Sequence, residues 1–163
     1  MALTKVQGEG ISGVSISANN EMTMSSQPAF MAYASTQNNI AVGSNVNVVF
    51  ANERFDQNAD FDGTSTFTAP ITGKYQLNIS LYLNTLDQAS AYYYLELQTS
   101  NDLYYNIFDS SKFSSDMAYW VLTLSHLVDM DASDTAVARV NQANGDSQTD
   151  INANSFFSGY LVC

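Results

Sequence analysis

The sequence predicts an all-β fold, a sandwich of two antiparallel sheets built from about ten short strands. The clearest signal is the alternation in residues 75–83, where every second side chain is apolar. Successive side chains of a strand point to opposite faces, so this strand packs one face on a core and turns Gln76, Asn78 and Ser80 outward. A second signal is that short apolar stretches recur between Gly, Asn, Ser and Asp turns without a convincing helical pattern.

The strands are expected at intervals through most of the chain. Pro70 and Gly73 mark the turn before the alternating strand, because proline fixes φ and glycine tolerates unusual φ values. Residues 117–130 are long enough for a helix, but their Tyr, Trp, Val, Thr and Leu content favours a strand. Residues 141–154 are expected to form a long polar loop. The ten expected strands are 28–34, 40–42, 46–50, a short one around Phe67, 75–83, 91–99, 103–108, 117–130, 135–140 and 156–162.

The first part of the chain differs in character from the rest. Residues 1–27 are rich in Gly, Ser and Asn and alternate only weakly, with short strands expected at 14–16 and 22–24. We interpret residues 1–27 as an extended N-terminal arm and residues 28–163 as one domain. The alternative is a flexible terminus, because chain ends are often poorly ordered.

Composition argues against nucleic acid and membrane as partners. It also indicates that packing or assembly, rather than a disulfide, stabilises the fold. The chain carries 16 Asp and Glu against 5 scattered Lys and Arg, a formal net charge of −11, which would repel a phosphate backbone and argues against nucleic acid. No apolar run approaches the roughly 20 residues that span a bilayer, so no membrane insertion is expected. Cys163 is the single cysteine and cannot form an internal disulfide.

The residues give little support for catalysis. His126 is the single histidine, and a triad could be drawn only with Ser125 or Asp129. Neighbours in a strand alternate faces, so Ser125 and His126 pair poorly, and a structural or interface histidine is favoured. Zinc ligands are missing as well. We therefore expect no catalytic residues, no cofactor-binding residues and no enzyme.

Two groups of acidic residues could hold a hard cation. Calcium takes several oxygen ligands, which closely spaced carboxylates in a loop can supply. Neither group matches an EF-hand loop, so the alternative is a solvated acidic turn. Calcium is the one cofactor considered, and the metal candidates are Asp129, Asp131 and Asp134; the second group is Asp56, Asp60 and Asp62.

Several positions carry a resemblance to the C1q-like globular head, of the C1q and tumour necrosis factor jelly-roll superfamily. The matching positions are Phe50, Asp56, Phe61, Phe67, Gly73 and Tyr75, together with the closing stretch 155–162. The chain departs from the family in a spacer one residue shorter before Phe67, and in Leu77 and Ile79 where aromatics are usual. The resemblance covers residues 28–162 and implies a ten-stranded antiparallel jelly-roll sandwich. Some such heads bind calcium near the trimer apex.

The resemblance also implies a homotrimer. Strands 30–34, 117–128 and 156–162 are apolar on both faces, whereas a sheet with water on its outer side should alternate. The C1q-like topology puts these strands in one sheet with residues 75–83, facing the threefold axis. Polar Gln76, Asn78 and Ser80 would fix the register there. The expected trimer interface is Phe30, Trp120, Leu122, Tyr160 and Val162.

A second resemblance concerns the first five residues, Met-Ala-Leu-Thr-Lys, which are similar to the leaders of tail and fibre proteins of tailed bacteriophages. Together the two resemblances imply a non-enzymatic trimeric virion structural protein, assembled in the host cytoplasm and carried on the extracellular particle. In the favoured version it is a fibre head or tip that binds a host-surface glycan or protein receptor, with the arm contacting other virion proteins. The alternatives are a trimeric capsid decoration or shell protein without a receptor, and a glycan-active enzyme on a β scaffold, which would need a carboxylate pair in a cleft.

Overall fold

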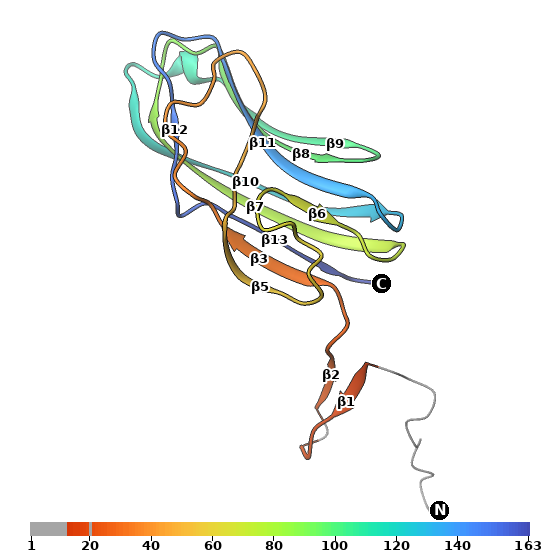
Figure 1. The fold of residues 1–163 in the computed structure, drawn as a ribbon. Helices are drawn as coiled ribbons and strands as arrows, with labels where there is room; N and C mark the ends of the chain where they lie inside the picture. Colours follow the sequence, from red (N-terminus) through yellow and green to blue (C-terminus); the bar gives the residue numbers. More distant parts are fainter. Residues whose placement is uncertain (1–12, 20) are drawn as a thin grey trace, which may run out of the picture.

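Two antiparallel sheets stacked face to face form the body of the protein, and a small hairpin projects from one end (Figure 1). The computed structural model describes residues 13–19 and 21–163. Within this part of the chain, no helix has the length and apolar character needed to cross a membrane. The elements are β1 (Val14–Ile16), β2 (Met22–Met24), β3 (Ala29–Tyr33), β4 (Val46–Asn47), β5 (Asn52–Asp56), β6 (Thr66–Thr68), β7 (Gly73–Leu86), β8 (Tyr92–Thr99), β9 (Leu103–Phe108), the 3-10 turn η1 (Ser110–Lys112), β10 (Met117–Met130), β11 (Thr135–Ala143), β12 (Asp150–Ile151) and β13 (Phe156–Leu161).

The first sheet of the sandwich contains the strands that the sequence singled out. Its order is β10-β7-β13-β3-β5, and β12 adds to one end of β7. The four strands expected to share a sheet, β3, β7, β10 and β13, therefore do so. The stretch 117–130 is a strand rather than a helix, paired with β7 along its whole length from Met117↔Leu86 to Met130↔Gly73.

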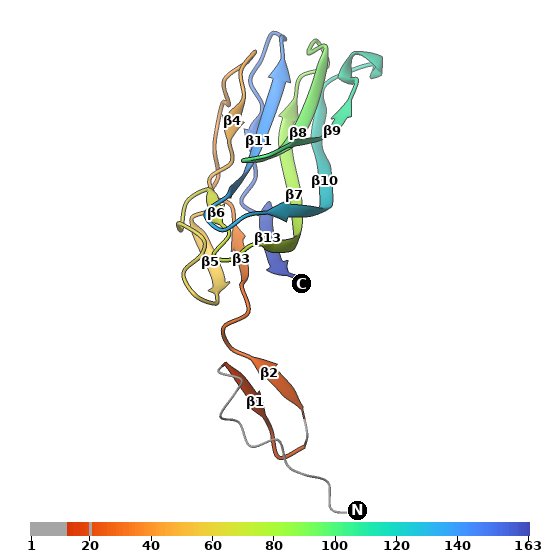
Figure 2. The same cartoon turned by 90° about the vertical axis from the view of Figure 1, so that its right-hand side faces the viewer.

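The second sheet has the order β4-β11-β8-β9, with β6 pairing the beginning of β11. The last strand of each sheet, β9 in one and β10 in the other, lies on the same side of the sandwich (Figure 2). No backbone ladder pairs β9 with β10 there, and one side-chain bond, from Asn106 Nδ2 to the Thr123 carbonyl at 2.7 Å, joins the two strands. This side is therefore an open edge that side chains must fill.

The core lies between the sheets and is almost entirely apolar. The inward face of β7 is fully buried, as the alternation predicted, and it belongs to the same core cluster as Tyr93, Leu95 and Leu97 of β8. Phe30 of β3 stacks between Phe61 and Phe67, with ring centroids 5.1 and 4.8 Å apart. Burial of such side chains is worth roughly 1.5–3 kcal/mol each, which explains how an acidic chain without an internal disulfide holds its fold.

Four details differ from the expected strand pattern. Of the strand expected at residues 46–50, only Val46–Asn47 forms, as β4. Residues 40–42 form no strand, because Ile40 turns into the core and Val42 makes only an isolated bridge to Gln142. Strand β5 was not expected, since Asn-Glu-Arg-Phe-Asp has no apolar alternation; it is an edge strand with mostly exposed side chains. The expected loop 141–154 contains the end of β11 and the short β12.

The two short strands expected in the arm pair with each other as the hairpin β1–β2, in the register Val14↔Met24 and Ile16↔Met22. Figure 2 shows the hairpin beyond the end of the sandwich, leading directly into β3. The first five residues, which carry the resemblance to fibre leaders, lie outside the described residues.

Candidate functional site

The outer face of the first sheet carries an exposed apolar margin along β10. Alternation in β10 turns Tyr119, Val121 and Leu127 outward, and these side chains are 64%, 45% and 57% exposed. The ring of Tyr119 lies 6.0 Å from that of Tyr82 on β7, so the aromatic surface continues onto the neighbouring strand. Apolar side chains of this size in water favour contact with a partner.

A polar strip runs beside this margin, along β7. Gln76 Nε2 donates to Ser125 Oγ at 2.9 Å and to Asn78 Oδ1 at 3.2 Å. Ser125 Oγ in turn donates to Asn78 Oδ1 at 2.8 Å. These three side chains satisfy one another across β7 and β10, so they form an ordered network on the surface rather than a set of free groups.

A second apolar margin lies beyond the polar strip, on β13, β3 and β5. Phe156 lies opposite Ser80 of β7 and packs on Tyr33, with ring centroids 6.0 Å apart. Arg54 of β5 places its guanidinium 4.8 Å from the centre of the Tyr33 ring. Tyr160, at the other end of β13, is 47% exposed. The outer face thus has two apolar margins with a hydrogen-bonded polar strip between them.

The expected interface residues divide into three groups. Tyr160 and Val162 are about half exposed, so their side chains are accessible to a partner. Phe30 and Leu122 are 1% and 3% exposed and pack in the core, so the expectation that they contact another subunit needs correction. Both have the inward parity of their strands. Leu127 and Val121 were not predicted as interface residues. When a strand is apolar on both faces, its sequence does not show which set of alternate residues faces the core.

Trp120 has a different role from the one expected for a residue of the sheet's outer face. It shares the inward parity of Leu122, but it lies at the open edge of the sandwich. Its ring stacks on Phe108 of β9 at 5.3 Å and meets Phe113 edge-on at 5.6 Å. Because Trp120 is still 36% exposed, this aromatic cluster both closes the edge and presents an apolar surface.

The nominal triad residues do not come together. Ser125 points to the outer face, where Gln76 and Asn78 bind it. His126 points the other way and packs on Tyr104 of β9 with ring centroids 4.5 Å apart. Asp129 returns to the outer face and pairs with Lys74 Nζ at 2.6 Å. Ser125 and His126 thus point to opposite faces, as the strand alternation predicted, and His126 lies at the open edge.

The three calcium candidates each have a partner of their own. Besides the pairing of Asp129 with Lys74, Asp131 Oδ1 accepts from Thr72 Oγ1 at 3.3 Å. Asp134 Oδ2 accepts from the Asp131 N–H at 2.8 Å and closes the turn. In the part of the chain that the structure describes, no three His, Cys, Asp or Glu side chains are grouped to hold a metal. Calcium binding at Asp129, Asp131 and Asp134 stays a prediction.

The second acidic group organises the loop before β6. Asp56 Oδ1 and Oδ2 accept from the backbone N–H groups of Asp60 and Phe61. Asp62 Oδ1 accepts from three successive N–H groups at 2.7–3.0 Å, those of Thr64, Ser65 and Thr66. Burial alone would raise the pKa of Asp62, but these three donors hold it below its ordinary value.

The outer face of the second sheet carries a cluster of tyrosines. Tyr94 stacks on Tyr92 at 6.1 Å and meets Tyr105 edge-on at 5.4 Å. Tyr92 and Tyr105 are 39% and 50% exposed, and Ile107 beside them is 59% exposed. This tyrosine cluster is the largest group of neighbouring aromatic rings on that face among the described residues, and it lies on the opposite side of the sandwich from β7 and β13.

Comparison with known proteins identifies the family. The sequence profile of the C1q domain matches residues 29–162, most of the chain. The chain belongs to the C1q domain family. Similar solved structures include the globular domain of the zebrafish complement 1qA protein, at TM-score 0.61 and 17% identity over 84% of this chain and 98% of that one. Murine APRIL at pH 8.0 has TM-score 0.60 and 9% identity over 83% and 99%. None of the curated proteins matches the chain significantly.

The C1q-domain positions found in the sequence are structural. Phe50, Phe61, Phe67 and Tyr75 are all buried in the core, and Tyr75 donates its hydroxyl hydrogen to the Ile71 carbonyl at 2.7 Å. The family motif therefore reports how the sandwich packs. It does not mark the exposed surfaces described above, so function has to be argued from those surfaces.

Proposed function

We propose that this C1q domain is the homotrimeric head of a virion fibre and that it catalyses nothing. The observation that carries the trimer is the outer face of the first sheet, with exposed Tyr119, Val121, Leu127 and Tyr160 on either side of a polar strip. A sheet face in water is normally polar, and an apolar face of this kind is stabilised by burial against another subunit.

A threefold contact needs two different patches on each subunit, because a cyclic trimer is built from head-to-tail interfaces. The outer face supplies one patch. The open edge of β9 and β10 supplies the other, through the partly exposed Trp120 and the neighbouring Phe113. In the proposed trimer, the edge of one subunit packs on the outer face of the next, which agrees with the homotrimer that the C1q resemblance implies.

Light scattering of the purified chain tests the trimer directly. We expect a mass three times that of the chain at low micromolar concentration, since burial of several large side chains per contact favours an obligate assembly. A soluble monomer at that concentration would refute the proposal.

The tyrosine cluster on the second sheet is the proposed contact for a host-surface receptor. Tyr92 and Tyr105 offer apolar faces with polar hydroxyl edges, the combination that suits sugar or protein contacts, and this face stays free when the first sheet is covered. Binding of labelled protein to host cells should fall strongly for Tyr105→Ala and stay unchanged for Lys112→Ala, an exposed residue at η1. Equal binding by both variants would show that the tyrosine cluster is not the receptor contact.

The virion assignment is supported by the resemblance of residues 1–5 to fibre leaders and by the arm that precedes the domain. Immunogold labelling of purified particles tests it: label at fibre tips is expected, whereas label spread over capsids would favour the decoration protein. A panel of glycan and ester substrates tests the absence of catalysis, and turnover lost on a single carboxylate substitution would favour the glycan-active enzyme.

A further inference from the structure

The hairpin β1–β2 has one apolar face and one polar face. Residues directly opposite each other in an antiparallel pair point to the same side. The pairs Val14↔Met24 and Ile16↔Met22 therefore share one side, while Ser15↔Thr23 lies on the other. Every side chain on the first side is apolar and none is charged.

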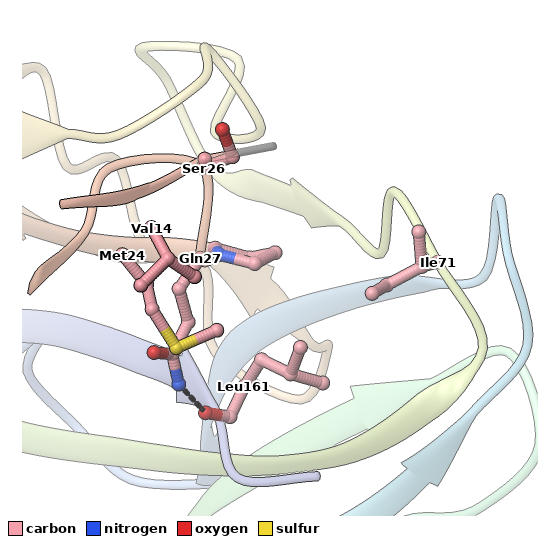
Figure 3. Close-up of a pocket in the computed structure, with 8 residues that line it drawn as sticks. Val14, Met24, Ser26, Gln27, Ile71 and Leu161 are labelled. Carbon is pink, nitrogen blue, oxygen red and sulfur yellow. Dashed lines mark hydrogen bonds between the residues drawn. The ribbon is translucent and has the colours of Figure 1, made fainter. Parts of the chain in front are cut away.

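The sandwich covers only the near end of this apolar face. Val14 and Met24 line a cavity of about 140 Å³ together with Pro28, Ile71 and Leu161 (Figure 3). Gln27 Nε2 donates to the Leu161 carbonyl at 2.6 Å and fixes the hairpin to the last strand, β13. This bond also sets the position of the hairpin relative to the sandwich.

The far end of the apolar face has no cover within the described chain. Ile16 and Met22 are 70% and 68% exposed, the two highest values among the large hydrophobic side chains described. A two-stranded hairpin is marginally stable by itself and needs further packing on one face. At the near end, Val14 and Met24 line a cavity with Leu161 and Ile71, and Met24 is still 48% exposed, so the hairpin lacks most of the packing that it needs.

We propose that the hairpins of the three subunits pack together through the face formed by Val14, Ile16, Met22 and Met24. The inference rests on the proposed trimer. The hairpin enters β3 directly after Gln27 and is bonded to β13, and both strands belong to the sheet whose outer face is the proposed subunit contact. The symmetry that joins three such faces also brings the three hairpins together.

The charge of the chain limits where two copies can touch. Only an uncharged surface allows close contact between them. With a net charge of −11, copies of the chain repel each other over most of their surface. The apolar hairpin face carries no charge, so three copies can approach there without that repulsion. The polar side, with Ser17 Oγ donating to Glu21 Oε2 at 3.2 Å, would remain in water.

Cysteine cross-linking distinguishes the two faces of the hairpin. The variants Ile16→Cys and Thr23→Cys are made in a Cys163→Ser background, so that each chain has a single thiol, and are treated with a short bismaleimide. We expect cross-linked dimers on a denaturing gel for Ile16→Cys and a monomer band for Thr23→Cys. The head should remain trimeric by light scattering in both.

Proteolysis gives a second measurement that does not depend on a thiol. Met22→Asp should make proteinase K remove the arm at least several-fold faster, whereas Thr23→Asp should leave the rate near that of the wild type. If light scattering shows a trimer but Ile16→Cys does not cross-link and the two Asp variants behave alike, the hairpin contact is overturned and the trimer stands. A monomer overturns the trimer itself.

Discussion

Glu96 and Arg139 form an ion pair on the outer face of the second sheet, with Arg139 Nε donating to Glu96 Oε1 at 2.5 Å. The two residues lie directly opposite each other on β8 and β11, and Tyr105 of β9 lies on the other side of Glu96. Although alternation turns Glu96 outward, these neighbours cover it and leave it 1% exposed.

Removing the arginine from this ion pair should strongly lower the stability of the fold. In Arg139→Ala the Glu96 carboxylate stays buried without a partner, and we expect a loss of about 3–5 kcal/mol in the free energy of unfolding. Urea denaturation measures it. The control is Lys112→Ala, because Lys112 pairs with Asp109 at 3.6 Å in solvent and such pairs contribute about 0–1 kcal/mol. Similar losses in both variants would contradict the expected role of burial.

Asp87 should make the fold sensitive to acid. Burial by itself would raise the pKa of Asp87, but the backbone N–H groups of Ser147, Ala89 and Asp146 hold it below its ordinary value. A lowered pKa in the folded state contributes stability that is present above the unfolded pKa of about 3.9 and is lost as pH falls through the folded value. The melting temperature should therefore fall below about pH 4.

The Asp87→Asn variant isolates this contribution. At neutral pH it should lose about 1.5–3 kcal/mol, the worth of hydrogen bonds to a charged group. Its melting temperature should also change less with acid than that of the wild type, though still somewhat, because the pKa of Asp62 is lowered in the same way. An unchanged acid dependence would show that Asp87 does not titrate as described.

Gly159 of β13 lies tightly against Leu77 and Phe30 in the core. A Cβ added there would contact Leu77 Cδ2 and would lie 2.8 Å from Phe30 Cε1, both below van der Waals distance. We expect Gly159→Ala to destabilise the fold by about 1–3 kcal/mol through overpacking, measured by thermal melting. The neighbouring Ser158→Ala, on the outer face, should change stability little; equal effects would contradict the packing argument.

Leu127 tests the proposed subunit contact. Leu127→Asp places a charge on the outer face of the first sheet and should shift the light-scattering mass from three chains towards one. Val42→Asp is the control, because Val42 is also exposed, at 36%, but lies against β11, away from β9 and β10. Dissociation by Val42→Asp and not by Leu127→Asp would contradict the proposed contact.

The fold was largely predictable because its strongest signals are local. The alternation of residues 75–83 fixes both the strand and its buried face, and the bulky content of 117–130 favours a strand over a helix. Strand β5 was not predictable in this way. Its residues are polar and exposed, and it exists because β3 offers it an edge to pair with, which is a tertiary effect.

The candidate site was less predictable. When a strand is apolar on both faces, its sequence does not say which parity enters the core, and Leu122 and Phe30 were assigned to the surface for this reason. The answer depends on the partner strand: Leu122 lies opposite Leu81, whose inward direction the alternation of β7 does reveal. Pairing a strand that is apolar on both faces with an alternating strand would have shown which of its residues face the core.

The position at which the arm joins the sandwich has a mechanical consequence. The arm leads into β3, which is held between β13 on one side and β5 on the other (Figure 2). Antiparallel hydrogen bonds lie perpendicular to the strands, so tension that the arm transmits along β3 would act across both ladders at once, in shear. In shear, many hydrogen bonds would bear the load together. They would not break one after another, so the head would resist being pulled from its anchor.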